Sequence, residues 1–167
     1  MKSTLQLACV TLICGCFGSD KPGTDTGSEL EPGSSTVSLT IDGTTTVWES
    51  PGASFVEVDQ TDWLTITDLG GGQGSLDLMV PDNLLPGTIS DFEICPEQYP
   101  DPDAPCGLLF FELAEFYDVV SGSYTVAGDP EPQGDVTGSF SLQLAHRDGT
   151  GETGSIQGRF SSYVNGY

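Results

Sequence analysis

Hydrophobic and polar residues alternate along most of the chain after residue 36. In residues 37–41, Val, Leu and Ile alternate with Ser and Thr, which is the period of a strand with one buried face. Asp-Gly follows at residues 42–43, and the alternation resumes in residues 44–49. This arrangement predicts a β-hairpin with a tight turn.

Shorter runs with the same period continue towards the C-terminus and are separated by turn residues. The Gly-rich residues 70–74 lie between two such runs and lack the Gly-Lys-Ser/Thr ending of a phosphate-binding loop, so they predict a hairpin loop. Residues 128–134, which include two prolines, predict another loop. The further strand-like runs are residues 55–58, 63–67, 76–80, 88–94 and 123–126.

Residues 108–113 form the most apolar run after the N-terminal region. An unbroken apolar run of this length predicts a central strand covered on both faces, with a buried helical turn through residues 114–117 as the alternative. Glu112 lies inside the run. It is either a carboxylate with a function in an apolar site or a strand residue that faces solvent.

One pattern occurs twice near the C-terminus: apolar-x-Gly-x-Phe-Ser, at residues 136–141 and again at residues 156–161. A glycine at the same place in two paired strands predicts a bulge or a close approach of the backbones. Since strand side chains alternate between faces, Phe140 and Phe160 are expected on the core side.

These patterns predict an all-β fold, an antiparallel β-sandwich or partly closed barrel of about 8–10 strands over residues 36–167. Residues 16–35 are rich in Gly, Ser, Thr, Asp, Glu and Pro. Such a segment cannot bury enough apolar area to offset its ordering entropy. It is expected to be a flexible tether with a reach of roughly 25 Å.

A short apolar run begins near Leu5 and ends at Ile13-Cys14-Gly15-Cys16. This ending resembles the lipobox of bacterial lipoproteins, in which a small residue precedes the acylated cysteine. The run is shorter than the roughly 20 apolar residues that span a bilayer. The resemblance implies that residues 1–15 are a signal peptide and that Cys16 is lipidated; the alternative is an ordinary secretory signal.

Lipidation of Cys16 would place the protein in the cell envelope. More than one acyl chain holds a protein stably on a membrane, so attachment would need nothing from the folded region. Phe17 follows the cysteine, whereas an Asp at that place retains many lipoproteins in the inner membrane. The resemblance therefore favours the outer membrane.

The charge balance restricts the partners of the chain. It has 25 acidic residues, 4 Lys and Arg, and a formal net charge of −21. Nucleic-acid binding requires a Lys/Arg footprint, so no nucleic-acid partner is expected, and contact with the membrane is expected only through the lipid anchor. The acidity indicates either a divalent cation or cationic partner, or simply a solvated, self-repelling surface.

Two cysteines remain after the lipobox, Cys95 and Cys106. In an exported chain they predict a disulfide. The rival interpretation is a zinc site, but two thiolates and the single histidine, His146, fall short of the usual four ligands.

The sequence names no catalytic residue and predicts no cofactor. His146 lies beside a predicted turn, where an exposed turn histidine is the ordinary interpretation and a Ser-His catalytic pair the rare one. Loop acids provide weak candidates for calcium, without the spacing of a known calcium loop. These candidates are Asp101, Asp103, Asp129, Glu131 and Asp135.

Residues 122–160 also resemble the closing strands of small all-β domains in uncharacterised bacterial envelope lipoproteins, through the Gly-Ser-Tyr-Thr-Val start and the Gly-Arg-Phe end. The resemblance implies location and fold rather than a reaction. The expected function is a lipid-anchored envelope protein with a non-enzymatic binding or structural role. The alternatives are a carboxylate-dependent hydrolase acting on glycans and a calcium-dependent binding module; the partner can be a protein, a glycan or a divalent cation.

Overall fold

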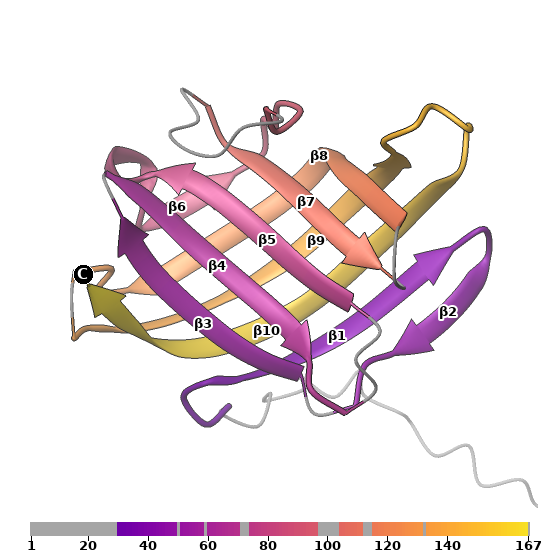
Figure 1. The fold of residues 1–167 in the computed structure, drawn as a ribbon. Coiled ribbons are helices and arrows are strands. Elements are labelled where there is room, and N and C mark those ends of the chain that lie inside the picture. Colours follow the sequence, from indigo (N-terminus) through magenta and orange to yellow (C-terminus); the bar gives the residue numbers. More distant parts are fainter. Residues whose placement is uncertain are drawn as a thin grey trace, which may run out of the picture.

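A computed structural model describes residues 30–49, 51–58, 60–70, 74–96, 104–111, 115–131 and 133–166. These residues form ten strands and one short 3-10 helix, of which eight strands close into an antiparallel barrel while β2 and β6 lie beside it (Figure 1). The all-β prediction is confirmed, and of its two architectures the barrel is observed. The strands are β1 (Ser34–Ile41), β2 (Thr44–Val47), β3 (Pro51–Val58), β4 (Thr61–Asp68), β5 (Gly74–Pro81), β6 (Gly87–Ile89), β7 (Cys106–Phe111), β8 (Glu115–Gly128), β9 (Asp135–His146) and β10 (Thr153–Gly166), with the 3-10 helix at Asp82–Leu84.

Sequential strands are neighbours around most of the ring. The order is β10-β9-β8-β7-β5-β4-β3-β1, and β1 pairs with β10 to close it. On the edge opposite β9, the long strand β10 pairs with two strands. Its first part pairs with β1, and its end pairs in parallel with β3, where Val164 lies opposite Phe55. Closure pairs both edges of the sheet, which abolishes most of the unpaired strand edge.

The first hairpin agrees with its sequence signal. Asp42 and Gly43 have φ angles of 46° and 78°, so both turn residues adopt the left-handed conformation of a type I′ turn. Beyond the turn, β2 pairs with β1 but not with β3. The hairpin therefore extends from the ring (Figure 1).

The interior of the barrel is filled by large side chains. Inward positions alternate with outward ones along each strand, as in the burial of β9, where Val136, Phe140, Leu142 and Leu144 are buried and the residues between them are exposed or half-buried. Side chains of this size fill the lumen of an eight-stranded barrel. The largest fully buried ones are Tyr117, Tyr124, Phe55, Phe160, Leu39, Leu64, Ile66, Leu76, Leu78, Leu109, Leu142 and Leu144.

The repeated Gly-x-Phe motif forms a reciprocal pair inside the barrel. Phe160 lies opposite Gly138, and Phe140 lies opposite Gly158. A Cβ at either glycine would meet the opposing Phe ring and a backbone carbonyl of the next strand. Both Phe side chains are buried. The predicted core position of the two aromatic residues is confirmed, and the glycines mark close approaches.

The alternative of a bulge at these glycines is wrong. The β9–β10 register runs without a shift, and the register shift of the last three strands lies in β8, between Val119 and Ser121. Each glycine lacks a side chain, which leaves room for the Phe ring that faces it. This packing explains the two glycines without a bulge.

The strand predicted for residues 88–94 is correct only at its start. Strand β6 ends at Ile89, and the following residues reach the start of β7, where Glu93 bridges Cys106 and its N–H donates to the Pro105 carbonyl at 2.9 Å. Cys95 is bonded to Cys106, with their Cα atoms 5.2 Å apart. The chain therefore runs to the start of β7 and the disulfide instead of extending β6, despite the alternation of its residues.

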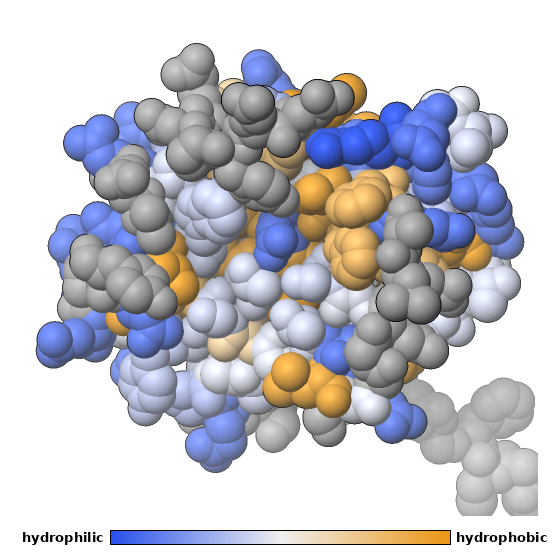
Figure 2. Space-filling view, viewed as in Figure 1, coloured by the Kyte–Doolittle hydropathy of each residue, from blue (hydrophilic) through white to orange (hydrophobic). Residues whose placement is uncertain are grey.

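The apolar run that begins at residue 108 is covered on both faces only in its first half. Leu109 is buried inside the barrel, while Leu108 packs outside it with Met79 and the disulfide. The next residue, Phe110, faces outward with 38% of its surface exposed and packs edge-on against Phe116 at 5.1 Å. Apolar groups surface among polar ones on this side of the molecule (Figure 2).

The helical turn considered for residues 114–117 is not formed by the residues that the structure describes. Strand β8 begins at Glu115 and its residues 115–118 pair with β7. Glu112 lies outside the described residues.

Within the described residues, no helix is long and apolar enough to cross a membrane.

Candidate functional site

The structure describes some of the residues that the sequence singled out. Cys95 and Cys106 form the predicted disulfide. Because both sulfurs are engaged in it, the zinc interpretation of these cysteines is wrong. Cys16, Asp101 and Asp103 lie outside the described residues.

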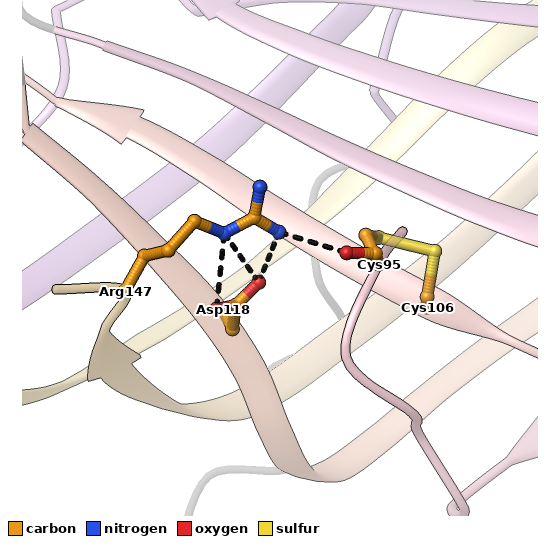
Figure 3. Close-up of a disulfide and its surroundings, with 4 residues drawn as sticks. All are labelled: Cys95, Cys106, Asp118 and Arg147. Atoms are coloured by element: carbon orange, nitrogen blue, oxygen red, sulfur yellow. Dashed lines mark hydrogen bonds and ion pairs between the residues drawn. A yellow bond between two sulfur atoms is a disulfide. The ribbon is translucent and has the colours of Figure 1, made fainter. Parts of the chain in front are cut away.

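Beside the disulfide, Arg147 joins three parts of the chain (Figure 3). Its Nε donates to both carboxylate oxygens of Asp118, at 3.1 and 3.2 Å, and its Nη2 lies 2.5 Å from Oδ1 of the same carboxylate. The same Nη2 also donates to the Cys95 carbonyl at 3.1 Å. A guanidinium matches a carboxylate in this forked geometry. The contact fixes the disulfide-bearing segment to β8 and to the end of β9.

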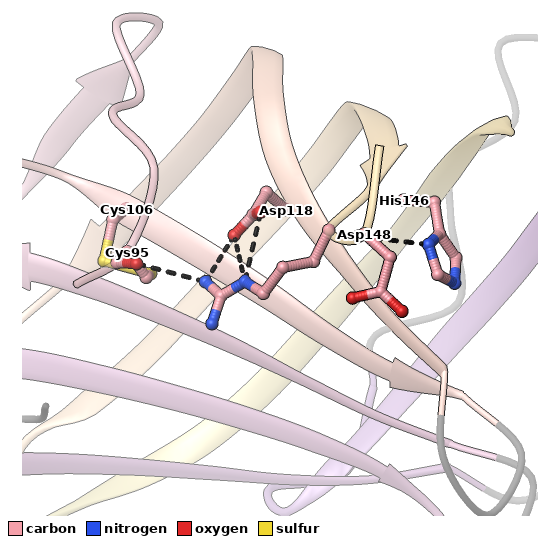
Figure 4. A network of polar contacts seen from close by, with 6 residues as sticks. Cys95, Cys106, Asp118, His146 and Asp148 are labelled. Carbon is pink, nitrogen blue, oxygen red and sulfur yellow. Dashed lines mark hydrogen bonds and ion pairs between the residues drawn. A yellow bond between two sulfur atoms is a disulfide. The ribbon is translucent and has the colours of Figure 1, made fainter. Parts of the chain in front are cut away.

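His146, at the end of β9, is half-buried rather than exposed, and Figure 4 shows it beside Asp148. Its Nδ1 accepts a hydrogen bond from the Asp148 N–H at 3.2 Å. Its ring packs edge-on against Tyr117, with the centroids 4.9 Å apart. These contacts make His146 part of the turn, as predicted, but the predicted exposure of its side chain is wrong.

Next to His146, two carboxylates approach one phenol. The Tyr117 O–H lies 3.4 Å from Glu115 Oε2 and 3.5 Å from Glu152 Oε2. Burial and then the negative charges of Glu115 and Glu152 raise the pKa of Tyr117 to about 12, because each disfavours a phenolate. Carboxyl groups act as general acids and bases when they lie within hydrogen-bond reach of a transferred proton.

Sequence reasoning missed this carboxylate pair. Glu115 and Glu152 are far apart in the sequence and belong to no motif. They come close because the start of β8 and the turn before β10 lie at the same end of the barrel. Glu115 is the first residue of β8, and Glu152 directly precedes β10. Only the ring order could have revealed the pair.

The acids at residues 129–135 are arranged as a turn. Asp129 Oδ1 accepts from the Glu131 N–H at 3.1 Å, and the Asp129 N–H donates to the Asp135 carbonyl at 3.0 Å. Of the three acids, only Glu131 lines the adjoining pocket of about 250 Å³, with Glu57 and Asp62. The described residues contain no group of three or more His, Cys, Asp or Glu side chains that could hold a metal ion.

A groove of about 610 Å³ opens along β1 and β10, across the ring from β7. Sequence reasoning did not select this region, because Ser, Thr and Gln alternating on a strand are typical of any solvated sheet face. The lining residues include Thr36, Ser38, Val47, Trp48, Gln157 and Arg159.

The described residues thus define a closed antiparallel β-barrel with a filled interior, whose polar clusters lie at its ends and on its outer face. No protein-family model, curated protein or solved structure is significantly similar to this chain.

Proposed function

We propose that this chain is a lipid-anchored cell-envelope protein whose barrel is a non-enzymatic binding module that uses its outer surface. The observation that carries the proposal is the filled interior. Tyr117, Tyr124, Phe55 and Phe160 are each less than 2% exposed. Barrels that carry a small ligand inside hold open space for it, whereas this lumen is occupied by its own side chains.

The anchor follows from the lipobox resemblance. Acyl chains on Cys16 hold the protein at the membrane, the residues between Cys16 and the start of β1 at Ser34 separate the barrel from the lipid, and Phe17 favours the outer membrane. The acidic surface discourages contact with anionic lipid headgroups, so the barrel faces outward towards its partner.

The anchor is tested by metabolic labelling with a fatty-acid analogue in a bacterial host. We expect Cys16→Ala to abolish labelling and processing, because the cysteine sulfur is the acyl acceptor. Cys14→Ala, two residues earlier and within the leader, is the matched control and should label normally. Label that persists in the Cys16→Ala variant would contradict the anchor.

One observation favours a second function, a carboxylate-dependent hydrolase acting on glycans. Glu115 and Glu152 both lie within 3.5 Å of the Tyr117 hydroxyl, and glycoside hydrolysis uses a pair of carboxyl groups. Release of reducing ends from a polysaccharide by the wild type, abolished by Glu115→Gln and by Glu152→Gln, would establish this function and exclude the non-enzymatic one.

A further inference from the structure

A wide part of the outer surface carries hydroxyl and amide side chains in regular rows. We define the hydroxyl face as thirteen outward side chains of β1, β10, β9, the second half of β8, and β6, which lie in three rows. Paired strands place the members of a row side by side. The rows are Thr36, Arg159, Ser139, Thr125 and Thr88; Ser38, Gln157, Ser141 and Ser123; and Thr40, Ser155, Gln143 and Ser121.

The hydroxyl face is free of carboxylates, although the chain has 25 acidic residues. None of its thirteen positions is Asp or Glu, and Arg159 is its single charged residue. The acidic residues of these strands lie outside the three rows: Asp135 is at the start of β9, and Glu115 and Asp118 are in the first part of β8.

Arg159 lies in the middle of its row, between Thr36 and Ser139. Its side chain is exposed, and among the described residues it forms no ion pair. The other described arginine, Arg147, is bound to Asp118. Arg159 is therefore the cation that this surface offers to a ligand, and a guanidinium binds a carboxylate with two parallel hydrogen bonds.

The neighbours of Arg159 suit a polyhydroxylated ligand. The groove of about 610 Å³ runs past Arg159 and Gln157, with hydroxyls from Thr36 and Ser38 and an apolar wall at Val47. Hydroxyl and amide groups both donate and accept hydrogen bonds, as sugar hydroxyls do. An apolar wall with a few polar groups is the usual composition of a ligand site.

We propose that the hydroxyl face binds an acidic glycan, a polysaccharide whose sugar rings carry carboxylates, with Arg159 holding one carboxylate. This inference rests on the proposed binding function and names its ligand class. The inference depends on Arg159 and on the absence of carboxylates from the rows around it. Acidic side chains on the rest of the barrel repel an anionic polymer, but at physiological salt the Debye length of about 8 Å limits that repulsion to short range. A neutral glycan would gain nothing from the absence of carboxylates.

A second copy of the chain fits the face less well. A symmetric dimer centred on the hydroxyl face would bring together the same patch from both copies. The two Arg159 guanidinium groups would then approach each other without a carboxylate on either surface, and like charges repel. An anionic ligand removes this conflict.

The test measures binding of the purified full-length protein in detergent to two polymers, polygalacturonate as the acidic probe and dextran as the neutral one. We expect saturable binding to polygalacturonate, with affinity falling by about ten-fold or more in Arg159→Ala and less in Arg159→Lys. The lysine variant keeps the charge but loses the forked geometry. Equal binding of dextran, or unchanged affinity in Arg159→Ala, would overturn the inference.

A pair of charge insertions separates a local site from a net-charge effect. Ser139→Asp places a carboxylate directly opposite Arg159 and should abolish binding. Ser54→Asp adds the same charge at an exposed position of β3, outside the hydroxyl face, and should leave binding nearly unchanged. Equal losses in both variants would contradict a site at Arg159, provided that thermal unfolding shows both folded.

Two measurements on the same samples distinguish the non-enzymatic function from the glycan inference. Reducing ends released from polygalacturonate would refute the non-enzymatic function, whereas the effect of Arg159→Ala on affinity decides the glycan inference alone. Absence of any binding to polygalacturonate would overturn the inference and leave the anchor and the binding function to their own tests.

Discussion

The reciprocal Gly–Phe pairs are expected to contribute a large part of the stability of the barrel. Phe160 is 1% exposed, faces Gly138 across β9 and β10, and packs near the Tyr124 ring with centroids 6.0 Å apart. Replacing a buried Phe by Ala removes its burial and leaves a cavity, which typically costs about 3–5 kcal/mol. Gly138 has no side chain with which to fill that cavity, so the upper part of the range applies to Phe160→Ala.

This loss is large compared with the roughly 5–15 kcal/mol by which a domain is stable. For a chain of this length, each 1 kcal/mol lowers the Tm by about 2–4 °C, so Phe160→Ala should lower it by roughly 10 °C or more. Urea unfolding followed by tryptophan fluorescence gives the free energy directly. The midpoint should fall with little change in the slope against urea.

The matched control is Gln157→Ala, on the same strand but on the outer face. Its side chain is exposed, so the change should stay within about 0.5 kcal/mol. His146→Ala should cost about 1 kcal/mol, because its ring contact with Tyr117 and the exposed hydrogen bond from the Asp148 N–H are lost. A cost below 1 kcal/mol for Phe160→Ala, or one no greater than that of Gln157→Ala, would refute the packing argument.

Two other perturbations test the polar contacts. Arg147→Ala should destabilise the fold by about 2 kcal/mol or more in urea unfolding, because it leaves the buried Asp118 carboxylate without its guanidinium; the double variant with Asp118→Asn should cost less than the sum of the single changes, and simple additivity would argue against the pair. For Tyr117, whose pKa is raised to about 12, the unfolded chain loses the phenol proton near pH 10 before the folded protein does. The resulting contribution to stability is complete below about pH 10 and is lost as pH rises towards 12. Tyr117→Phe should therefore flatten the decline in unfolding free energy measured from pH 9 to pH 12, and an unchanged decline would contradict the raised pKa.

Local signals in the sequence predicted the local structure well. Asp42-Gly43 specified the first hairpin because a type I′ turn requires a left-handed conformation at both residues. Residues 63–67 and 76–80 alternate with period two and pair with each other in β4 and β5. Periodicity failed at residues 90–94, where the chain runs beside the start of β7 to the disulfide with Cys106.

The candidate sites were less predictable because they depend on which strands are neighbours. The approach of Glu115 and Glu152 to Tyr117 follows from the ring order, which alternation does not encode. The absence of carboxylates from the hydroxyl face could not be recognised in the sequence either. Ser139 and Arg159 are unremarkable when taken separately, and their significance appears only when the register places them in one row.

The buried motif and the hydroxyl face are connected through that register. A slip of one residue between β9 and β10 would turn the buried side chains outward. A slip of two residues would keep the faces but would place either Phe140 against Phe160, two rings in one layer, or Gly138 against Gly158, with a void between them. Both outcomes lose packing energy that the observed register retains. Because side chains alternate strictly, the register that places each Phe over a Gly inside the barrel also fixes Arg159 beside Ser139 outside it.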